Sequence, residues 1–333
     1  MTRSEELLKD ETVVLVLTNN KKVDKTIPNT VPLMIEKSCK DIGMLCYIIT
    51  PDTNFVTVNN GTVTIYDASE KIKPIKVEAS NTVCFVRSGM TTDPSGIVYI
   101  LQNGGVFLVN YPQSIIFCSN KLTSHLSFKD NGIPTPKTSF VNNSKVIRES
   151  VKRVGGKYPI IIKSLKGSQG IGVSIADTYQ SLVSNMQALW KHKAKLLIQQ
   201  YIPVKYDIRT IVLDGKIVAC VKRVAVEGEF RTNISRGGNS ERYELSNDEI
   251  DLVHKVAEIS GGYLVGVDHI NHKGKLYALE VNGSPNMSSP YHRPYIKYTS
   301  YVDEKPDKLI NGQKLCDVII DYISDKNNWG KHE

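Results

Sequence analysis

The sequence contains no apolar run that approaches the roughly 20 residues needed to cross a membrane. Its longest apolar stretches, such as residues 13–17, have the length of a strand. The N-terminal residues lack the basic region and apolar core of a secretory signal. Among the six cysteines there is no C-x-x-C pair, and most lie in apolar runs. We therefore expect a cytoplasmic protein with reduced, buried thiols, without a zinc site or a disulfide framework.

The chain also lacks the long basic runs that are typical of nucleic-acid-binding segments. Its formal net charge is +8, yet no run of five basic residues occurs and no basic stripe alternates with aromatic residues. The charge fits nucleic-acid binding, an ordinary basic surface, or a site where Lys and Arg side chains gather around anionic substrates. The motifs below favour the third interpretation and argue against a nucleic-acid partner.

A regular alternation of strand-like and helix-like segments is present in the first part of the chain. Apolar segments at 12–18, 45–49, 83–87 and 106–110 are separated by helix-like segments, among them 32–43. This alternation predicts an open α/β domain with a mostly parallel sheet. The polar segment between its second and third strands, residues 53–80, is expected to form short strands and loops.

The rest of the 333 residues mixes strands with helices, and a chain of this length is expected to fold into two or three lobes. The segment Asn131–Pro136 interrupts the helical pattern. Asp214-Gly215 is a strong two-residue turn signal and predicts a hairpin. We expect three domains, at residues 1–120, 121–205 and 206–333.

A glycine-rich loop follows a strand that ends in Lys163, and its glycines are Gly167, Gly170 and Gly172. Glycines allow backbone N–H groups to approach a phosphate closely. The spacing matches neither a P-loop nor a dinucleotide fingerprint. Because the loop joins strand to strand, we interpret it as a flap over phosphates; a plain glycine-rich hairpin is the alternative.

Three oxygen-bearing side chains are expected on one face of a second hairpin. Glu280 and Asn282 are two residues apart on a strand and so share a face. A hairpin loop at residues 273–275 would place Asp268 opposite Glu280. Two carboxylates and an amide oxygen suit Mg²⁺ bound together with phosphates. The alternative is a polar, solvated sheet face, but the flanking residues are apolar and would make unpaired carboxylates costly.

Basic residues that could neutralise phosphate charge are spread over the same region. Arginine binds phosphate and carboxylate oxygens bidentately, and phosphoryl transfer depends on positioning and charge neutralisation. Taken singly, each of these residues is more often a surface charge than a ligand. The evidence for a site comes from the order in which they occur along the chain. The set is Lys121, Lys163, Arg223, Arg231 and Arg236.

The order of these motifs resembles that of ATP-grasp ligases, and most closely the RimK-like group, which adds glutamate-type residues to amines. The resemblance is continuous over about 155–290 and weaker over about 83–137. It rests on the segment Phe230-Arg231-Thr232-Asn233, on Arg236-Gly237-Gly238, and on the carboxylates described above. It implies a mixed α/β and α+β protein in which an N-terminal open α/β (pre-ATP-grasp) domain precedes a two-lobed ATP-grasp fold.

The resemblance implies a role for each matching residue. One or two magnesium ions, with manganese as a possible substitute, would be held by Asp268, Glu280 and Asn282. Arg231, Arg223 and Lys163 would be catalytic. The substrates would contact Arg87, Arg209, Arg236, Gly237 and Ser284. ATP would be bound by Lys121, Lys163, Gly167, Ser168, Gln169, Gly170, Gly172, Gln200, Tyr201, Ile202, Asp207, Arg231 and Asn233.

The implied reaction is the ATP-dependent formation of an amide through an acyl phosphate. The partners would be an amino-acid donor such as glutamate and a peptide, protein or small-amine acceptor, and the chain could form a homo-oligomer. His269 is a candidate general base by position, although a histidine in such a place is more often structural. The family usually has glutamate where this chain has Gln200, and the tyrosine-rich stretch after Pro290 also departs from it. The alternatives are a non-catalytic nucleotide-binding module and a small-molecule peptide ligase of the glutathione synthetase type.

Overall fold

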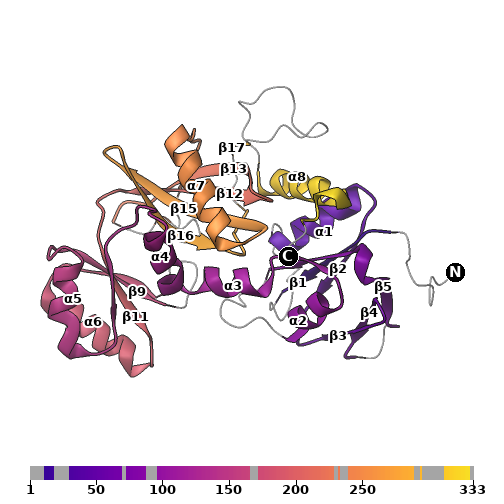
Figure 1. The fold of residues 1–333 in the computed structure, drawn as a ribbon, viewed down its shortest axis with the longest axis horizontal. Coiled ribbons are helices and arrows are strands. Elements are labelled where there is room, and N and C mark those ends of the chain that lie inside the picture. Colours follow the sequence, from indigo (N-terminus) through magenta and orange to yellow (C-terminus); the bar gives the residue numbers. More distant parts are fainter. Residues whose placement is uncertain are drawn as a thin grey trace.

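The structure is a computed structural model that describes residues 11–18, 30–69, 73–87, 96–165, 172–228, 232, 239–288, 293–294 and 311–330. Three bodies lie side by side along the long axis (Figure 1). The N-terminal body lies at the right of the view, a small central lobe at the left, and a larger C-terminal sheet between them. No helix in the described part of the chain is long and apolar enough to span a bilayer.

The N-terminal body is built on a parallel sheet in the order β2-β1-β6-β7. The strand β1 (Val13–Leu17) is entirely apolar and entirely buried, as expected for a strand covered on both faces. The other strands are β2 (Leu45–Ile49), β6 (Thr82–Val86) and β7 (Phe107–Val109). The predicted open parallel domain is therefore confirmed.

Two different layers cover this sheet. On one face, α1 (Val31–Asp41) packs with the C-terminal helix α8 (Gly312–Ser324). On the other face lie α2 (Gly96–Asn103) and a small antiparallel sheet. That sheet corresponds to the segment expected to form short strands, and it consists of β3 (Asn54–Asn59), β4 (Thr62–Asp67) and β5 (Ile75–Glu78).

The central lobe is an antiparallel sheet in the order β10-β9-β11-β8, with two helices on one face. Alternate residues of β9, Ile160 and Ile162, pack against these helices, so Lys163 lies on the other face. The elements are β8 (Thr138–Val141), α5 (Ile147–Arg153), β9 (Ile160–Ser164), β10 (Val173–Ala176), α6 (Tyr179–Lys191) and β11 (Leu196–Gln200).

The C-terminal sheet has the order β14-β13-β12-β15-β16, and β17 (Arg293–Pro294) also pairs with β13. One face packs on α7 (Asn247–Ser260) and on Phe128 of α4 (Lys121–Asp130). A capping box between Ser246 and Glu249 starts α7, and Gly261 ends it in the left-handed conformation. The strands are β12 (Tyr206–Leu213), β13 (Lys216–Val224), β14 (Asn239–Glu241), β15 (Leu264–His272) and β16 (Lys275–Asn282).

The N-terminal body and the C-terminal sheet share one hydrophobic core. Ile211 and Leu213 of β12 lie in the same cluster as Val14 and Val16 of β1, together with Ile319 of α8. The helix α3 (Pro112–Ser119) connects the two bodies (Figure 1). The central lobe has a separate core of its own, contributed by its sheet and by α5 and α6.

Candidate active site

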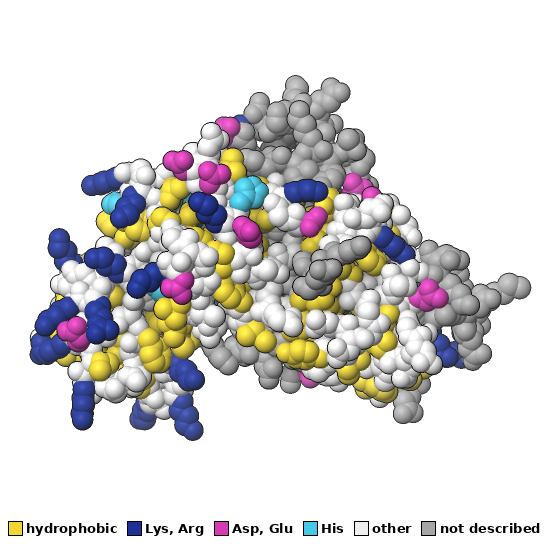
Figure 2. Space-filling model, in the orientation of Figure 1, with side chains coloured by type: hydrophobic (Ala, Val, Ile, Leu, Met, Phe, Trp, Pro, Cys, Tyr) yellow, Lys and Arg dark blue, Asp and Glu magenta, His cyan; other side chains and the backbone are white. Residues whose placement is uncertain are grey.

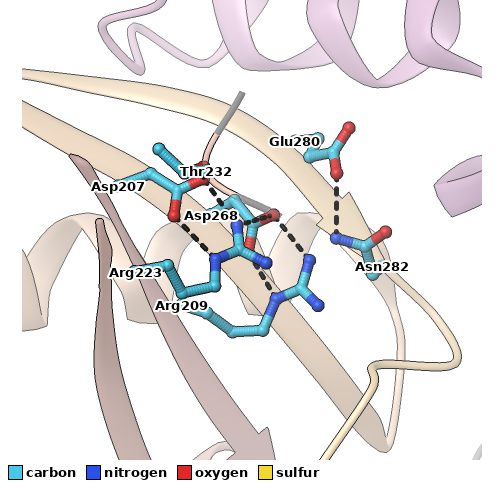
Figure 3. Close-up of polar contacts among 7 residues, drawn as sticks. All are labelled: Asp207, Arg209, Arg223, Thr232, Asp268, Glu280 and Asn282. Carbon is cyan, nitrogen blue, oxygen red and sulfur yellow. Dashed lines mark hydrogen bonds and ion pairs between the residues drawn. The ribbon is translucent and has the colours of Figure 1, made fainter. Parts of the chain in front are cut away.

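The candidate site lies on the face of the C-terminal sheet opposite α7. Four adjacent strands contribute charged or amide side chains to it, which follow the alternation of the strands (Figure 3). Cross-strand pairing brings Arg223 opposite Asp207, Arg209 opposite Asp268, and Asp268 opposite Glu280. The sheet register therefore assembles residues that are up to 75 positions apart in the chain.

The predicted pairing of Asp268 with Glu280 is confirmed, but the predicted three-residue loop is wrong. The turn consists of Lys273 and Gly274 alone, both with positive φ, and His272 pairs with Lys275. A bulge between Asp268 and His269 then shifts the register by one residue. The two errors cancel, so the carboxylates still lie opposite each other.

Two arginines bind the buried carboxylates of β12 and β15. Arg209 donates from Nε to Asp268 Oδ1 and from Nη2 to Oδ2, both at 2.7 Å. Arg223 donates from Nε to Asp207 Oδ1 at 2.7 Å and from Nη2 to Asp207 Oδ2 at 2.5 Å. Its Nη2 also reaches Asp268 Oδ2 at 2.9 Å, and Thr232 Oγ1 donates to Asp207 at 2.6 Å. The four charged residues thus form one continuous ion network (Figure 3).

The network keeps the Asp268 carboxylate ionised. Burial alone would raise the pKa of Asp268, but the charges and hydrogen bonds of Arg209 and Arg223 outweigh it and hold that pKa well below its usual range. Burial likewise opposes the charge of Arg223, and Asp207 and Asp268 together raise its pKa. We expected Arg223 to be catalytic and Arg209 to contact substrate; in the structure, both guanidinium groups bind carboxylates of the protein.

The candidate metal ligands differ in how many of their oxygen lone pairs already accept hydrogen bonds within the protein. A carboxylate has about four lone-pair sites, and Asp268 uses three of them on arginine N–H groups. Glu280 Oε1 accepts from Asn282 Nδ2 at 3.3 Å, which leaves the amide oxygen of Asn282 for a ligand. Among the described residues, no three His, Cys, Asp or Glu side chains form a cage of their own. Two carboxylates and an amide fit a cation that takes its other ligands from phosphates and water.

Lys163 brings positive charge to the same place from the central lobe. Burial lowers the pKa of its ammonium group, Glu280, Asp268 and Asp207 raise it, and Lys121 lowers it. These charges act on one another because β9 carries Lys163 towards the C-terminal sheet. The backbone N–H of Lys121 donates to Leu165 at the end of β9. The charges of both lysines thus act in the region of the candidate metal ligands, and their contact with phosphate stays a prediction.

His125 of α4 lies in the same electrostatic environment, and sequence reasoning did not find it. Its Nδ1 is 3.2 Å from Thr135 Oγ1. Burial, with the charges of Lys163 and Lys129, lowers its pKa from 6.5 to about 4. The side chain is therefore neutral at neutral pH. Only its proximity to Lys163 in the fold marks it, so nothing in the local sequence could have shown this.

The low pKa of His125 makes stability depend on pH. Between pH 6.5 and about 4 the unfolded chain binds a proton that the folded chain does not, so acid lowers the free energy of unfolding in this window. We expect the His125→Gln variant to lose less stability than the wild type between those pH values in urea unfolding. His254→Gln, an exposed position on α7, serves as the control. Parallel pH profiles for wild type and His125→Gln would contradict this.

The segment after β16 is held by the N-terminal body. Asn110 is fully buried; its Nδ2 donates to Gly283 at 2.6 Å and to Leu264 at 2.7 Å, and its Oδ1 accepts from the Leu264 N–H at 2.7 Å. Arg87 donates from Nη2 to the carbonyl of Pro285 at 2.7 Å. The sequence alone gave no role to the side chain of Asn110.

Ser284 lies between these two anchored carbonyls, next to the candidate ligand Asn282. Burial lowers the pKa of Arg87 to about 10, so the side chain stays charged at neutral pH, and its Nε is buried without a hydrogen-bond partner. The predicted contact of Arg87 with a substrate stays a prediction. Gly266 is required in this region because a Cβ there would lie 2.7 Å from the Cβ of Pro285.

The segment that contains the predicted ATP-binding residues Gln200, Tyr201 and Ile202 connects β11 of the central lobe to β12 of the C-terminal sheet. Gln200 ends β11 and its N–H donates to Lys137 at 2.8 Å, while Tyr201 and Ile202 continue without regular structure. Gly172, at the end of the glycine-rich loop, has φ of +77°, and a Cβ there would lie 2.9 Å from Ser164 Cβ.

Several predicted site residues lie outside the described residues. They are Gly167, Ser168, Gln169, Gly170, Arg231, Asn233, Arg236 and Gly237. His269, the candidate general base, is described and lies on the opposite face. It is fully buried, with Nε2 3.5 Å from Glu249 of α7. The interpretation of His269 as a base is therefore wrong, because the side chain belongs to the packing of α7 on the sheet.

Comparison with known proteins agrees with this geometry. The family model of the RimK-like ATP-grasp domain matches residues 118–295. A probable alpha-L-glutamate ligase of Vibrio parahaemolyticus is 35% identical over 240 residues, which are 72% of this chain and 74% of the relative. A protein of the same description from Shewanella loihica is 36% identical over 204 residues, or 61% of this chain and 67% of the relative.

Solved structures show a similar fold at low sequence identity. The ATP-grasp ligase PsnB, complexed with a minimal precursor, has a TM-score of 0.63 and 17% identity, and the match covers 94% of this chain and 98% of PsnB. D-alanyl-alanine synthetase A from Vibrio cholerae has a TM-score of 0.63 and 16% identity, covering 83% and 90% of the two chains. The expectation of an N-terminal α/β domain followed by an ATP-grasp fold is confirmed.

Proposed function

Because this chain belongs to the RimK-like ATP-grasp family, a family of ATP-dependent amide-forming ligases, we propose that it joins the carboxylate of an amino acid to an amine of a peptide or protein. Glutamate is the proposed amino acid, since the similar proteins of Vibrio and Shewanella are described as probable alpha-L-glutamate ligases. The proposed cofactor is Mg²⁺, with Mn²⁺ as a substitute, and ATP is the proposed phosphoryl donor.

The observation that carries this proposal is the convergence of Glu280, Asn282 and Asp268 with the half-buried Lys163. A donor carboxylate attacks the γ-phosphorus of ATP, ADP leaves, and an acyl phosphate forms. The acceptor amine then attacks the acyl carbon, phosphate leaves, and the amine gives up a proton. A cation held by Glu280, Asn282 and Asp268 would offset phosphate charge.

The residues of the chain have separate parts in this reaction. Lys163 and Lys121 attract the phosphates, and Arg87 orients a carboxylate beside Ser284. Arg209 and Arg223 fix Asp268, so they act as positioning residues. No protein nucleophile is required, because ATP activates the carboxylate directly. His269 is not assigned the role of accepting the proton from the amine.

The experiment that tests the proposal is an ADP-release screen over amino acids and acceptor peptides with MgATP, followed by mass spectrometry of the products. We expect ADP release only when donor and acceptor are both present, and a product heavier than the acceptor by one dehydrated amino acid. Tight ATP binding without ADP formation over the whole panel would instead support a non-catalytic nucleotide-binding module.

A further inference from the structure

The positive charge of the chain is concentrated in the central lobe. Residues 138–200 contain ten Lys or Arg and only two Asp or Glu, a net charge of +8, whereas the rest of the chain holds 32 of each sign. The entire net charge therefore lies in about a fifth of the sequence. Lys163 is used by the candidate site, but it accounts for only one of these ten residues. An excess of this kind creates a field that attracts anionic partners.

Eight of these ten basic residues have exposed side chains, and blue side chains cover much of this lobe in Figure 2. Two groups of them are distinguished by their place in the fold. The first group, the α5 row, consists of Lys145, in the short 3-10 turn at residues 144–146 that runs directly into α5, and of Arg148 and Lys152, which lie four residues apart on one face of α5. The second group, the α6–β11 turn, consists of Lys191, Lys193 and Lys195. In the space-filling view, blue side chains cover the lobe at the left, while acidic side chains are more frequent elsewhere.

Few acidic groups in the lobe compensate this charge. Glu149 lies 3.9 Å from the ammonium group of Lys152 and 3.4 Å from Nε of Arg153, and all three side chains are more than half exposed. Such surface pairs contribute little. The only other acidic residue of the segment is Asp177, which is exposed ahead of α6. The attraction for a polyanion is therefore largely unopposed.

The position of the two groups indicates a ligand longer than a nucleotide. The α5 row lies on the helical layer, and Lys163 lies on the opposite face of the sheet. The α6–β11 turn, in contrast, borders the site: the carbonyl of Lys195 accepts from the N–H of Leu165 at 2.9 Å, where β9 ends. A ligand that contacts both groups would run from the edge of the site around the lobe, which ATP is too short to do.

We propose that the α5 row and the α6–β11 turn form a docking surface for an acidic polypeptide, the acceptor of the ligase. This inference rests on the proposed function, because adding glutamate makes the acceptor more acidic. A polypeptide fits better than a nucleic acid, since single-stranded nucleic acids are usually bound by aromatic side chains interleaved with basic ones. Among the described aromatic residues of the lobe, only Phe140 is exposed, and it lies on β8.

The direct test measures binding of a fluorescein-labelled oligoglutamate peptide by fluorescence anisotropy, without ATP. We expect K145E/K152E and K191E/K193E/K195E each to bind at least about tenfold more weakly than wild type, and the wild-type affinity to fall steeply with salt. The matched control is K255E/K273E/K275E, which changes three exposed lysines of the C-terminal lobe and should bind like wild type. Thermal unfolding of all variants verifies that the fold is retained.

The outcomes separate this inference from the proposed function. If the peptide binds as expected but no acceptor is modified, the ligase proposal fails and the docking surface stands. With an active acceptor, the variants should raise KM for an acidic peptide while leaving kcat and the KM for ATP unchanged. Equal binding by wild type and both lobe variants would overturn the inference. The inference would also be overturned if the control variant bound the peptide as weakly as the lobe variants. The same holds if an RNA oligomer bound more tightly than the peptide and lost this affinity in the lobe variants.

Discussion

Replacing Glu280 with glutamine is expected to lower kcat for ADP release at least about a hundredfold. Glutamine keeps the size of the side chain and can still contact Asn282, but it carries no negative charge to bind a divalent cation. The carboxylate whose charge also acts on the half-buried Lys163 would be lost. Steady-state ADP release should be measured over a wide range of Mg²⁺ concentrations, because a weakened site also raises the amount of Mg²⁺ required.

Glu241→Gln is the matched control for this experiment. Glu241 lies on β14 of the same sheet, half-exposed, and pairs with Lys222 at 2.8 Å. Its replacement removes the same charge outside the site, so kcat and the Mg²⁺ requirement should not change. If Glu280→Gln retains wild-type activity with the correct substrates, the assignment of Glu280 as a metal ligand is wrong.

Replacing Arg223 with methionine is expected to lower the free energy of unfolding by about 3–5 kcal/mol. Arg223, Asp207 and Asp268 are 3%, 7% and 2% exposed, so water cannot replace the lost guanidinium group. Asp207 would lose both of its arginine hydrogen bonds, and Asp268 would keep only those from Arg209. Urea unfolding followed by circular dichroism measures the effect.

The neighbouring residue provides the control for Arg223. Lys222→Met removes a positive charge from the same strand, but Lys222 faces the other side and makes a surface pair with Glu241. Its loss should cost no more than about 1 kcal/mol. A similar, small effect of both substitutions would show that the buried network is not what stabilises this sheet.

Much of the architecture could be predicted because short, local sequence patterns determine it. The apolar runs of β1 and β6 and the turn signal at Asp214-Gly215 each specify one element without reference to the rest of the chain. The short elements α3, β8 and α5 were not predicted. With four to eight residues each, they are too short to show a clear period, and tertiary packing determines them.

The types of residue in the candidate site could be predicted from the sequence, but the contacts between them could not. Oxygen ligands two residues apart on a strand share a face whatever the loop, so Glu280 and Asn282 could be paired correctly. The bulge beside Asp268 could not be predicted, because nothing in the local sequence distinguishes a one-residue slip from a longer turn. The ion network depends on β12 lying between β13 and β15, which is a property of the whole sheet. For the same reason the side chain of Asn110 had no evident role.

The shared core of the N-terminal body and the C-terminal sheet has a consequence for catalysis. Asn110 and Arg87 bind the segment that follows Asn282, so the two bodies hold the candidate cation ligands and Arg87 in one rigid unit. The central lobe has its own core and continues into the C-terminal sheet through residues 201–205. Under the proposed function, a movement of the central lobe would displace Lys163 but would leave the spacing of the cation ligands and Arg87 unchanged.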